Sequence, residues 1–366
     1  MVTCQDEFIG NPLVNNYSPN NNVTQIMDTT AVEQHWDLML NGAVTLAGFT
    51  TAPSVYVEAP ETLVYSVRVN ANAAVPGGVN ETFKSVDFPY LRFITNLYTG
   101  QDIQRIAPGT SNAQQYFESV PRLFFGDPVA IDSVTGKSAE ARYWLDGRLL
   151  SASGLTLSIG WRDQAGLFYG GVAGTYSGMQ GKITVKSRHY FGIPNQTAQG
   201  ATIARQYIRE VQQQFPVLST GVDQQFYNLR VGAILHRLVI KGLVAPSTTG
   251  VSFTDPSVTP LGANNTRSEG ARVKLKVNNN ALVPLDAGYT QLVRSYPLIF
   301  NLANSHQPGA SVDLTPHLVY EPSSQHAIQS MLNLRAAINM TLWGDTTLAS
   351  TPTSILLTYV ERVRPQ

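Results

Sequence analysis

The chain has 366 residues, and its 25 lysines and arginines are balanced by 25 aspartates and glutamates, so the formal net charge is zero. This length exceeds what one hydrophobic core usually serves and predicts two domains, while 43% hydrophobic residues exclude a disordered chain. Charged residues make up only 14%, against about 25% in typical soluble domains; amide, hydroxyl, glycine and proline residues take their place, and such a surface favours ordered self-association.

The charges are unevenly placed along the chain. Arg68 is the first basic residue, whereas seven acidic residues precede it. A secretory signal peptide needs a basic start and an apolar run, so we expect none here. A basic arm that neutralises nucleic acid is also missing at this end, and later charges are scattered, so we expect no direct contact with nucleic acid. Cys4 is the only cysteine, which excludes an internal disulfide.

The first 40 residues are predicted to form an N-terminal arm, whose residues 1–27 look irregular because they are rich in asparagine and proline and have little periodicity. Thr30 and Glu33 have the spacing of a helix capping box. A short helix over Trp36–Leu40 is therefore expected at the end of the arm, and Gly42 ends it.

From Val44 onward, apolar and polar residues alternate with period two. This pattern, punctuated by Gly, Pro and Asn, predicts short antiparallel strands that are buried on one face, and therefore a mainly β protein. The alternating runs are Leu63–Val69, Leu155–Trp161, Ile183–Val185, Val273–Val277, Ile338–Leu342 and Ile355–Val363.

One segment just past the middle of the chain has helical spacing instead, and Pro216 ends it. It predicts a connecting helix within residues 197–216, between a first β domain at 41–196 and a second at 217–366. Its apolar residues are Ile203, Tyr207, Ile208, Val211 and Phe215. We expect all of these except Ile208 to pack the helix against the β domains, which is a structural role.

The two β regions also begin alike. Tyr56 precedes Leu63–Val69 at the same distance as Tyr227 precedes Ile234–Ile240, and the apolar positions of the two runs coincide without a gap. This coincidence favours a shared architecture in the two halves.

Two long segments rich in glycine, proline and hydroxyl residues, 163–181 and 244–271, predict loops that serve as functional or interaction surfaces. The aromatic residues Phe168, Tyr169 and Tyr176 in the first of them suit stacking on sugars. They suit equally well the anchoring of the loop or a subunit interface.

Sequence motifs of common enzymes are missing: there is no Gly-x-Ser-x-Gly elbow, phosphate-binding loop, dinucleotide fingerprint or HExxH. The nearest approach to a metal site is His317, Glu321 and His326, which the simpler interpretation places as polar residues of a loop around Pro316 and Pro322.

Two carboxylates beside tryptophans, Asp146 and Asp163, suggest a sugar-cleaving pair. The alternative is that Asp146-Gly147 forms a hairpin turn. On balance we predict no catalytic, cofactor-binding or metal-binding residues, and no enzyme.

The chain resembles the double jelly-roll major capsid proteins of tailless, membrane-containing icosahedral viruses such as tectiviruses and corticoviruses. The resemblance lies in two β regions of similar size around a helix, in the two opening runs Tyr56–Val69 and Tyr227–Ile240, and in the long loops. The resemblance implies two tandem eight-stranded jelly-roll barrels with a connecting helix. It also implies a virion location, in a bacteriophage or similar virus, and homotrimers that form pseudo-hexagonal capsomers.

The same resemblance implies contacts with neighbouring capsomers, with minor capsid or penton proteins and with an internal lipid membrane. Because the N-terminal arm is acidic, a contact with protein suits it better than one with anionic lipid. Two alternatives stay open: a trimeric β-sandwich spike or receptor-binding protein, and a two-domain β carbohydrate-active enzyme.

Overall fold

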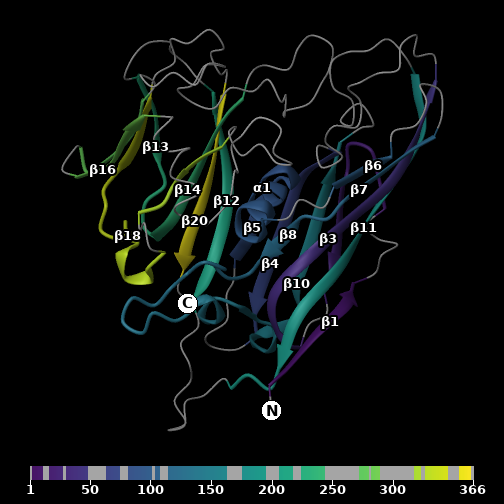
Figure 1. Ribbon diagram of the computed structural model, residues 1–366, viewed down its shortest axis with the longest axis horizontal. Helices are drawn as coiled ribbons and strands as arrows, with labels where there is room; N and C mark the ends of the chain where they lie inside the picture. Colours follow the sequence, from purple (N-terminus) through teal and green to yellow (C-terminus); the bar gives the residue numbers. More distant parts are fainter. Residues whose placement is uncertain are drawn as a thin grey trace.

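The computed structural model describes most of the strands and the segments that join them (Figure 1). The described residues are 2–10, 16–27, 30–47, 63–74, 81–100, 104–107, 114–162, 175–194, 206–216, 224–243, 272–279, 282–288, 317–322, 326–344 and 354–363. In this part of the chain the protein is mainly β, and no helix is long and apolar enough to cross a membrane.

Eight main strands form the first barrel. They are β1 (Thr3–Ile9), β2 (Asn22–Ile26), β3 (Val32–Ala47), β4 (Val64–Ala73), β5 (Glu81–Val86), β7 (Gln114–Ser119), β10 (Leu150–Trp161) and β11 (Thr175–Phe191). One sheet has the order β1-β11-β3-β7 and the other has the order β2-β10-β4-β5. The short strands β6 (Gln104–Ala107), β8 (Arg122–Phe124) and β9 (Leu145–Asp146) add to the first sheet.

Eight more main strands form the second barrel. They are β12 (Tyr207–Pro216), β13 (Gln224–Leu229), β14 (Ile234–Leu243), β15 (Arg272–Val277), β16 (Leu282–Gly288), β17 (His317–Tyr320), β19 (Met340–Gly344) and β20 (Ser354–Val363). The strand orders are β12-β20-β14-β17 and β13-β19-β15-β16, and the short β18 (Leu332–Asn333) pairs with β14.

Both barrels follow one topology. If the main strands of each barrel are numbered in chain order, one sheet contains the first, eighth, third and sixth, and the other contains the second, seventh, fourth and fifth. This arrangement is the jelly roll, and it occurs twice in this chain. The predicted tandem of two jelly rolls is confirmed.

The proposed sequence alignment of the two halves is wrong in detail. The run Leu63–Val69 falls in β4 from Val64 onward, the fourth main strand of its barrel, whereas Ile234–Ile240 falls in β14, the third main strand of the other. The topological partner of β4 is β15. The runs look alike because both are strands rich in apolar residues, and such residues are common in buried strands whatever their place in the barrel.

Each barrel encloses its own hydrophobic core. Trp36, Leu157 and Trp161 belong to the first core, and Leu238 and Leu275 belong to the second. Side chains alternate as predicted: Val67 and Val69 of β4 are fully buried, and Arg68 between them is exposed. The cores therefore lie between the two sheets of each jelly roll.

The predicted connecting helix is wrong where the structure describes it, because β12 is a strand. It pairs antiparallel with β20 along its full length and parallel with β5 at two residue pairs. The prediction rests on a spacing of four residues between Tyr207, Val211 and Phe215. This spacing puts side chains on one face of a helix, but it is also a multiple of two and so puts them on one face of a strand. Ile203 lies outside the described residues.

The α-helix that the structure describes, α1 (Phe88–Thr99), belongs to the first barrel, between β5 and β6. Its N-cap Asp87 accepts a hydrogen bond from the backbone N–H of Tyr90, Pro89 lies in its first turn, and Gly100 ends it in the left-handed conformation. These features are typical start and stop signals of a helix. Short 3-10 turns occur at Glu140–Arg142, Gly147–Leu149 and Ile328–Ser330.

The prediction that the N-terminal arm is irregular over residues 1–27 is also wrong where the structure describes it. The predicted arm contains β1, β2 and the first half of β3, and β1 pairs with β11 over its whole length. The expected helix at Trp36–Leu40 is part of β3, where Trp36, Leu38 and Leu40 alternate into the core. Of the predicted loops, 244–271 lies wholly outside the described residues, and 175–181, the end of the other, is the start of β11.

Candidate functional site: the seam between the barrels

The parallel contact between β5 and β12 joins one sheet of each barrel into a single nine-stranded sheet. We call the contact zone around it the seam. On the first-barrel side it comprises β5, α1 and a strap, defined as residues 125–149; on the second-barrel side it comprises β12, β14 and residues 317–322 and 326–330. Figure 1 shows α1 and β5 beside β12 and β20 in the middle of the molecule. A chain poor in charge concentrates buried ion pairs here.

Arg237 of β14 lies at the centre of the larger group of charges and is fully buried. Its Nη2 donates to both carboxylate oxygens of Asp127 in the strap, at 2.8 and 2.7 Å, and its Nε donates to Glu321 at 2.8 Å. Its Nη1 donates to the hydroxyl of Tyr98 in α1. The planar guanidinium thus connects two carboxylates and a phenol from both barrels.

Each of the two carboxylates, Asp127 and Glu321, also contacts a histidine. Nδ1 of His236 lies 3.1 Å from Asp127, and Nδ1 of His326 lies 2.5 Å from Glu321. Burial raises the pKa of Asp127, but Arg237 and His236 outweigh this effect and hold it well below its usual range. Burial lowers the pKa of His236, although Asp127 opposes the shift. We call these five residues and Tyr98 the Arg237 cluster.

A second group of charges joins β5 to β12 directly. Lys84 and Glu210 are partners in the strand register, and Nζ of Lys84 lies 3.2 Å from Oε2 of Glu210, both side chains being buried. Beside them, Arg209 contacts Glu81 of β5, and its Nη2 lies 2.7 Å from Glu361 of β20. These pairs supplement a main-chain contact that is only two residues long.

Amides and apolar side chains complete the seam. Gln212 of β12 accepts a hydrogen bond from the backbone N–H of Asp87 at 2.7 Å and donates one to its carboxylate at 3.1 Å. Val239 and Val319 of the second barrel pack into the first core. The seam is therefore closed by main-chain, polar and apolar contacts together.

The strap of the first barrel crosses to the second. The backbone N–H of Ile131 donates to the carbonyl of His326 at 2.9 Å, and Ile328 donates back to Ile131 at 3.0 Å. A small apolar cluster includes Ile328 of this bridge and combines residues from both barrels: Ala130, Ala139, Tyr143, Ile208, Ile328 and Val360. Asp132, which accepts from two backbone N–H groups and from Arg142, shapes the turn of the strap.

This arrangement suits rigid attachment. Removal of one partner of a buried ion pair typically costs about 3–5 kcal/mol, because it leaves an uncompensated charge. The seam contains several such pairs from different elements, so rotation of one barrel against the other would break them at the same time. We conclude that the two barrels form one block with a fixed internal geometry.

The residues weighed as a metal site have other roles where the structure describes them. Glu321 and His326 meet, but Glu321 also binds Arg237, and the backbone of His317 pairs with that of Lys241 in the register of β17 and β14. Within the described ranges, no group of three or more His, Cys, Asp or Glu side chains could hold a metal ion.

The proposed sugar-cleaving residues also have other roles. Asp146 is buried, accepts from the backbone N–H of Arg148 and forms a two-pronged ion pair with its guanidinium. Asp163, Phe168, Tyr169 and the side chain of Tyr176 lie outside the described part of the structure. Two surface hollows occur, of about 580 and 440 Å³. Among the described residues that line them, the larger has no acidic side chain and the smaller has only Asp87. Neither hollow contains the carboxylate pair that a glycosidase needs.

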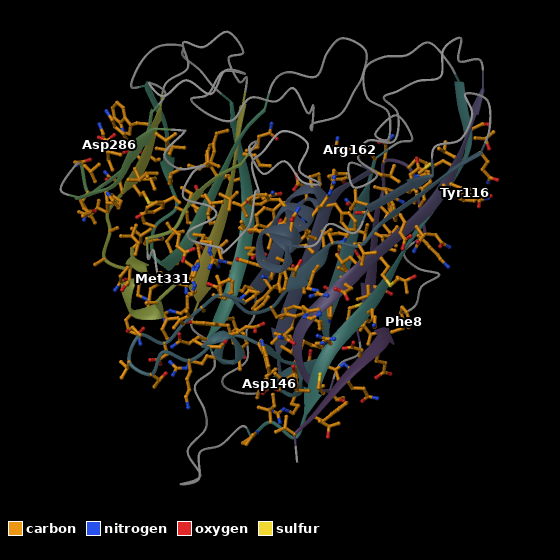
Figure 2. All side chains as sticks on the ribbon, viewed as in Figure 1. Phe8, Tyr116, Asp146, Arg162, Asp286 and Met331 are labelled. Atoms are coloured by element: carbon orange, nitrogen blue, oxygen red, sulfur yellow. The ribbon has the colours of Figure 1, made fainter. Side chains whose placement is uncertain are left out.

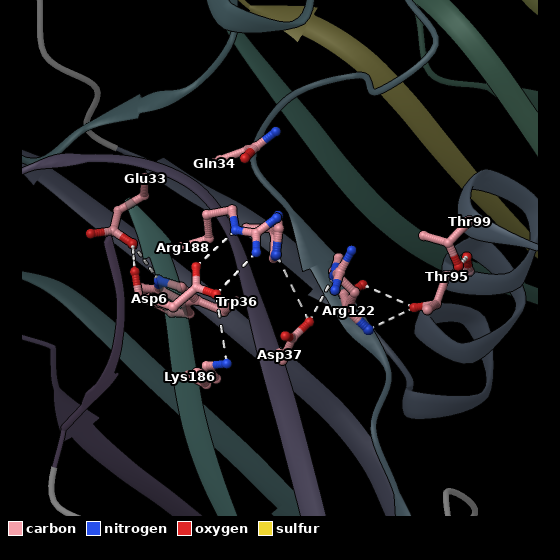
Figure 3. Close-up of polar contacts among 12 residues, drawn as sticks. Asp6, Glu33, Gln34, Trp36, Asp37, Thr95, Thr99, Arg122, Lys186 and Arg188 are labelled. Carbon is pink, nitrogen blue, oxygen red and sulfur yellow. Dashed lines mark hydrogen bonds and ion pairs between the residues drawn. The ribbon is translucent and has the colours of Figure 1, made fainter. Parts of the chain in front are cut away.

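A different set of charges lies on the outer sheet of the first barrel. Asp6 of β1 binds Arg188 and Lys186 of β11, while Asp37 of β3 binds Arg122 of β8 (Figure 3). These groups are partly exposed. Phe8 at the same edge is 62% exposed, and Figure 2 shows it at the outer side of the molecule.

Comparison with known proteins supports the topology. No protein-family model matches the sequence, and no curated protein matches it either. Among solved structures, the STIV MCP has a TM-score of 0.68 at 12% identity, covering 99% of this chain and 97% of that one. The PBCV-1 virus capsid has a TM-score of 0.57 at 12% identity, covering 99% and 94%.

The major capsid protein of bacteriophage PM2 has a TM-score of 0.52 at 11% identity, covering all of this chain and 98% of that chain. Identities this low establish the fold alone. The chain therefore has the double jelly-roll fold, which it shares over its whole length with these structures of viral capsids.

Proposed function

We propose that this chain is a major capsid protein, a structural virion component that builds the shell of a tailless icosahedral virus with an internal membrane. The observation that carries the proposal is the match of both jelly rolls, in the same order, over 99% of this chain and 97% of the STIV MCP. A likeness confined to one barrel would have left many unrelated β proteins as candidates.

In this proposal three copies form a homotrimer. Two similar barrels in each chain give the trimer six barrels, which form a pseudo-hexagonal capsomer. The seam supports this role, since a tile fits its neighbours only if its two barrels keep one orientation. The partners are neighbouring capsomers, minor capsid or penton proteins and the internal membrane. Nucleic acid is not a direct partner.

The oligomeric state is the first test. Sedimentation and light scattering of the purified protein should give a stable particle of about three times 39.9 kDa, and negative-stain images should show a hexagonal outline. A compact monomer at all concentrations would contradict the proposal. A trimer with no hexagonal outline and no ability to form sheets or shells would favour the spike alternative.

Tyr207 and Phe215 are proposed to tie β12 into both barrels. Tyr207 is buried in the first core, where its ring packs edge-on against Phe83 at 5.6 Å, and Phe215 packs against the second core. Replacing both by Asp should abolish soluble trimers, because each change places a carboxylate in a core. Gln213→Asp is the control, since Gln213 is exposed on the same strand; a normal sedimentation profile of the double variant would refute the assignment.

A further inference from the structure

The two buried basic side chains of the seam, Arg237 and Lys84, have different numbers of hydrogen-bond partners. The guanidinium of Arg237 has partners for each of its nitrogens, from Asp127, Glu321 and Tyr98. The ammonium of Lys84 has one carboxylate, Glu210, and no other hydrogen-bond partner among the described residues. Lys84 is also the only lysine in the described part of the chain that is buried.

The pair of Lys84 and Glu210 has a high desolvation cost if both groups stay charged. Transfer of an ammonium and a carboxylate into a protein interior costs several kcal/mol for each ion, and the attraction repays this only when further hydrogen bonds satisfy the remaining groups. Around Lys84 these further bonds are missing among the described residues, and its aromatic contact is with the Phe83 ring, whose centroid lies 5.8 Å from Nζ. The hydroxyl of Tyr90 is also buried without a hydrogen-bond partner in the described part of the chain.

The strand register holds the two side chains together. Glu210 and Lys84 are directly opposite in the parallel pair of β12 and β5, and their ends are 3.2 Å apart in a site without exposure to solvent. A reaction between groups fixed in this way proceeds as if one reactant were present at about 10⁵–10⁸ M. A lysine in an apolar site is also a better nucleophile, because desolvation favours its neutral amine.

From this geometry we propose that Lys84 and Glu210 are joined by a covalent amide, an isopeptide bond that staples the first barrel to the second. Nζ of Lys84 attacks Cδ of Glu210, so that an N–C bond forms and one C–O bond breaks. The departing oxygen leaves as water with two hydrogens of the ammonium, and the third stays on the amide nitrogen. The reaction changes no oxidation state and needs no co-reactant.

The neighbouring groups fit this reaction. Burial lowers the pKa of Lys84, with Glu210 opposing the shift, so the neutral, nucleophilic amine forms more readily than it does in water. Burial raises the pKa of Tyr90 well above its usual value, and the Glu210 carboxylate adds to the rise. Tyr90 therefore keeps its proton, and because its hydroxyl has no hydrogen-bond partner among the described residues, it is available to donate one to the carboxyl oxygen as that group reacts.

The first experiment uses the unmodified protein. Its intact mass under denaturing conditions should be one water less than the mass of the uncrosslinked chain. Trypsin does not cleave after an acylated lysine, so residues 69–92 should appear as one peptide joined to residues 210–230. A full-mass chain that yields separate peptides 69–84 and 210–230 would overturn the proposal.

Variants identify the atoms. Glu210→Gln should still form the bond but lose one ammonia in place of one water, because the leaving group is then the amide nitrogen. Lys84→Met combined with Glu210→Leu, a change that leaves no buried charge alone, should have its full mass and migrate differently on a denaturing gel. A deficit of one water that persists in this double variant would show that the loss occurs elsewhere, and would refute the assignment.

Two single variants separate the chemistry from general damage to the seam. Glu81→Gln alters the adjacent pair with Arg209 and should leave the crosslink complete. Tyr90→Phe removes only the hydroxyl and should slow the formation of the bond, seen as a larger fraction of full-mass chain soon after synthesis. An unchanged fraction in Tyr90→Phe would refute the role given to this hydroxyl.

Discussion

The seam and the outer edge at β1 and β11 contain ion pairs of almost the same length. Arg237 lies 2.7 Å from Asp127 in the seam, and Arg188 lies 2.8 Å from Asp6 at the edge. The side chains of the first pair are not exposed at all, whereas those of the second are 42% and 34% exposed. Water and salt screen the second pair, so its contribution to stability is small. Burial, not distance, decides what each pair contributes.

Arg237→Met is expected to have the largest effect. It leaves Asp127 and Glu321 buried without their cation and should lower the free energy of unfolding by about 3–5 kcal/mol, or prevent folding. Denaturant unfolding followed by circular dichroism measures this. Arg68→Met is the matched control, because Arg68 is exposed on β4 of the same sheet and should change stability by less than about 0.5 kcal/mol. Equal effects of the two variants would contradict the comparison.

Arg209→Met should have an intermediate effect, because this arginine joins Glu81 and Glu361 but keeps some access to water. We expect a loss of about 2–3 kcal/mol in the free energy of unfolding. Double-mutant cycles with Glu81→Gln and Glu361→Gln divide the loss between the two carboxylates. A loss as small as that of Arg68→Met would show that the Arg209 pairs do not hold β5 to β12.

Acid should weaken the seam before it weakens the cores. Burial lowers the pKa of His236, so the unfolded chain takes up this proton near 6.5 while the folded chain resists it. Stability should therefore fall as the pH drops below 6.5. The pKa of Asp127 is below its ordinary 3.8, so its contribution persists above 3.8 and is lost only in stronger acid.

The measurement is the unfolding free energy of wild type and His236→Gln from roughly pH 7.5 to pH 5. The wild-type curve should slope in this window, and the curve of the variant should be flatter there. Parallel curves would show that another group is responsible for the acid sensitivity.

Arg188→Met should have the smallest effect. Hydrogen bonds from Arg188 lower the pKa of Asp6 to about 2, although burial opposes them. Both groups are exposed, so after screening we expect a loss of only about 0–1 kcal/mol, present above pH 3.8 and smaller at high salt. Thermal unfolding at low and high salt checks this. A loss comparable to that of Arg237→Met would refute the importance of burial.

The sequence allowed the fold class to be predicted because alternation with period two is a local signal. The same local view failed at β12, since residues four apart share a face in a strand as well as in a helix. It also failed at β1 and β2, which are short, polar and largely exposed, and which are strands only because β11 and β10 pair with them.

The seam could not be found from spacing, because its partners come from distant parts of the chain. Asp127 and Arg237 are 110 residues apart, and Lys84 meets Glu210 only through the pairing of β5 with β12. One local signal did exist: His236 and Arg237 interrupt an otherwise apolar strand, Ile234–Ile240. A basic pair in a buried strand implies carboxylate partners, even though the sequence does not say which.

The union of the two barrels through β5 and β12 also bears on how the chain folds during synthesis. All main strands of the first barrel end at Phe191, before β12 begins at Tyr207, so this barrel can close while the second is still unmade. Until β12 arrives, β5 is an open sheet edge, the kind of surface on which misfolded chains pair. When β12 is made, it can pair with the exposed edge of β5 that already exists. Synthesis from the N-terminus therefore covers an edge that could otherwise pair with other chains, and uses it to start the second barrel.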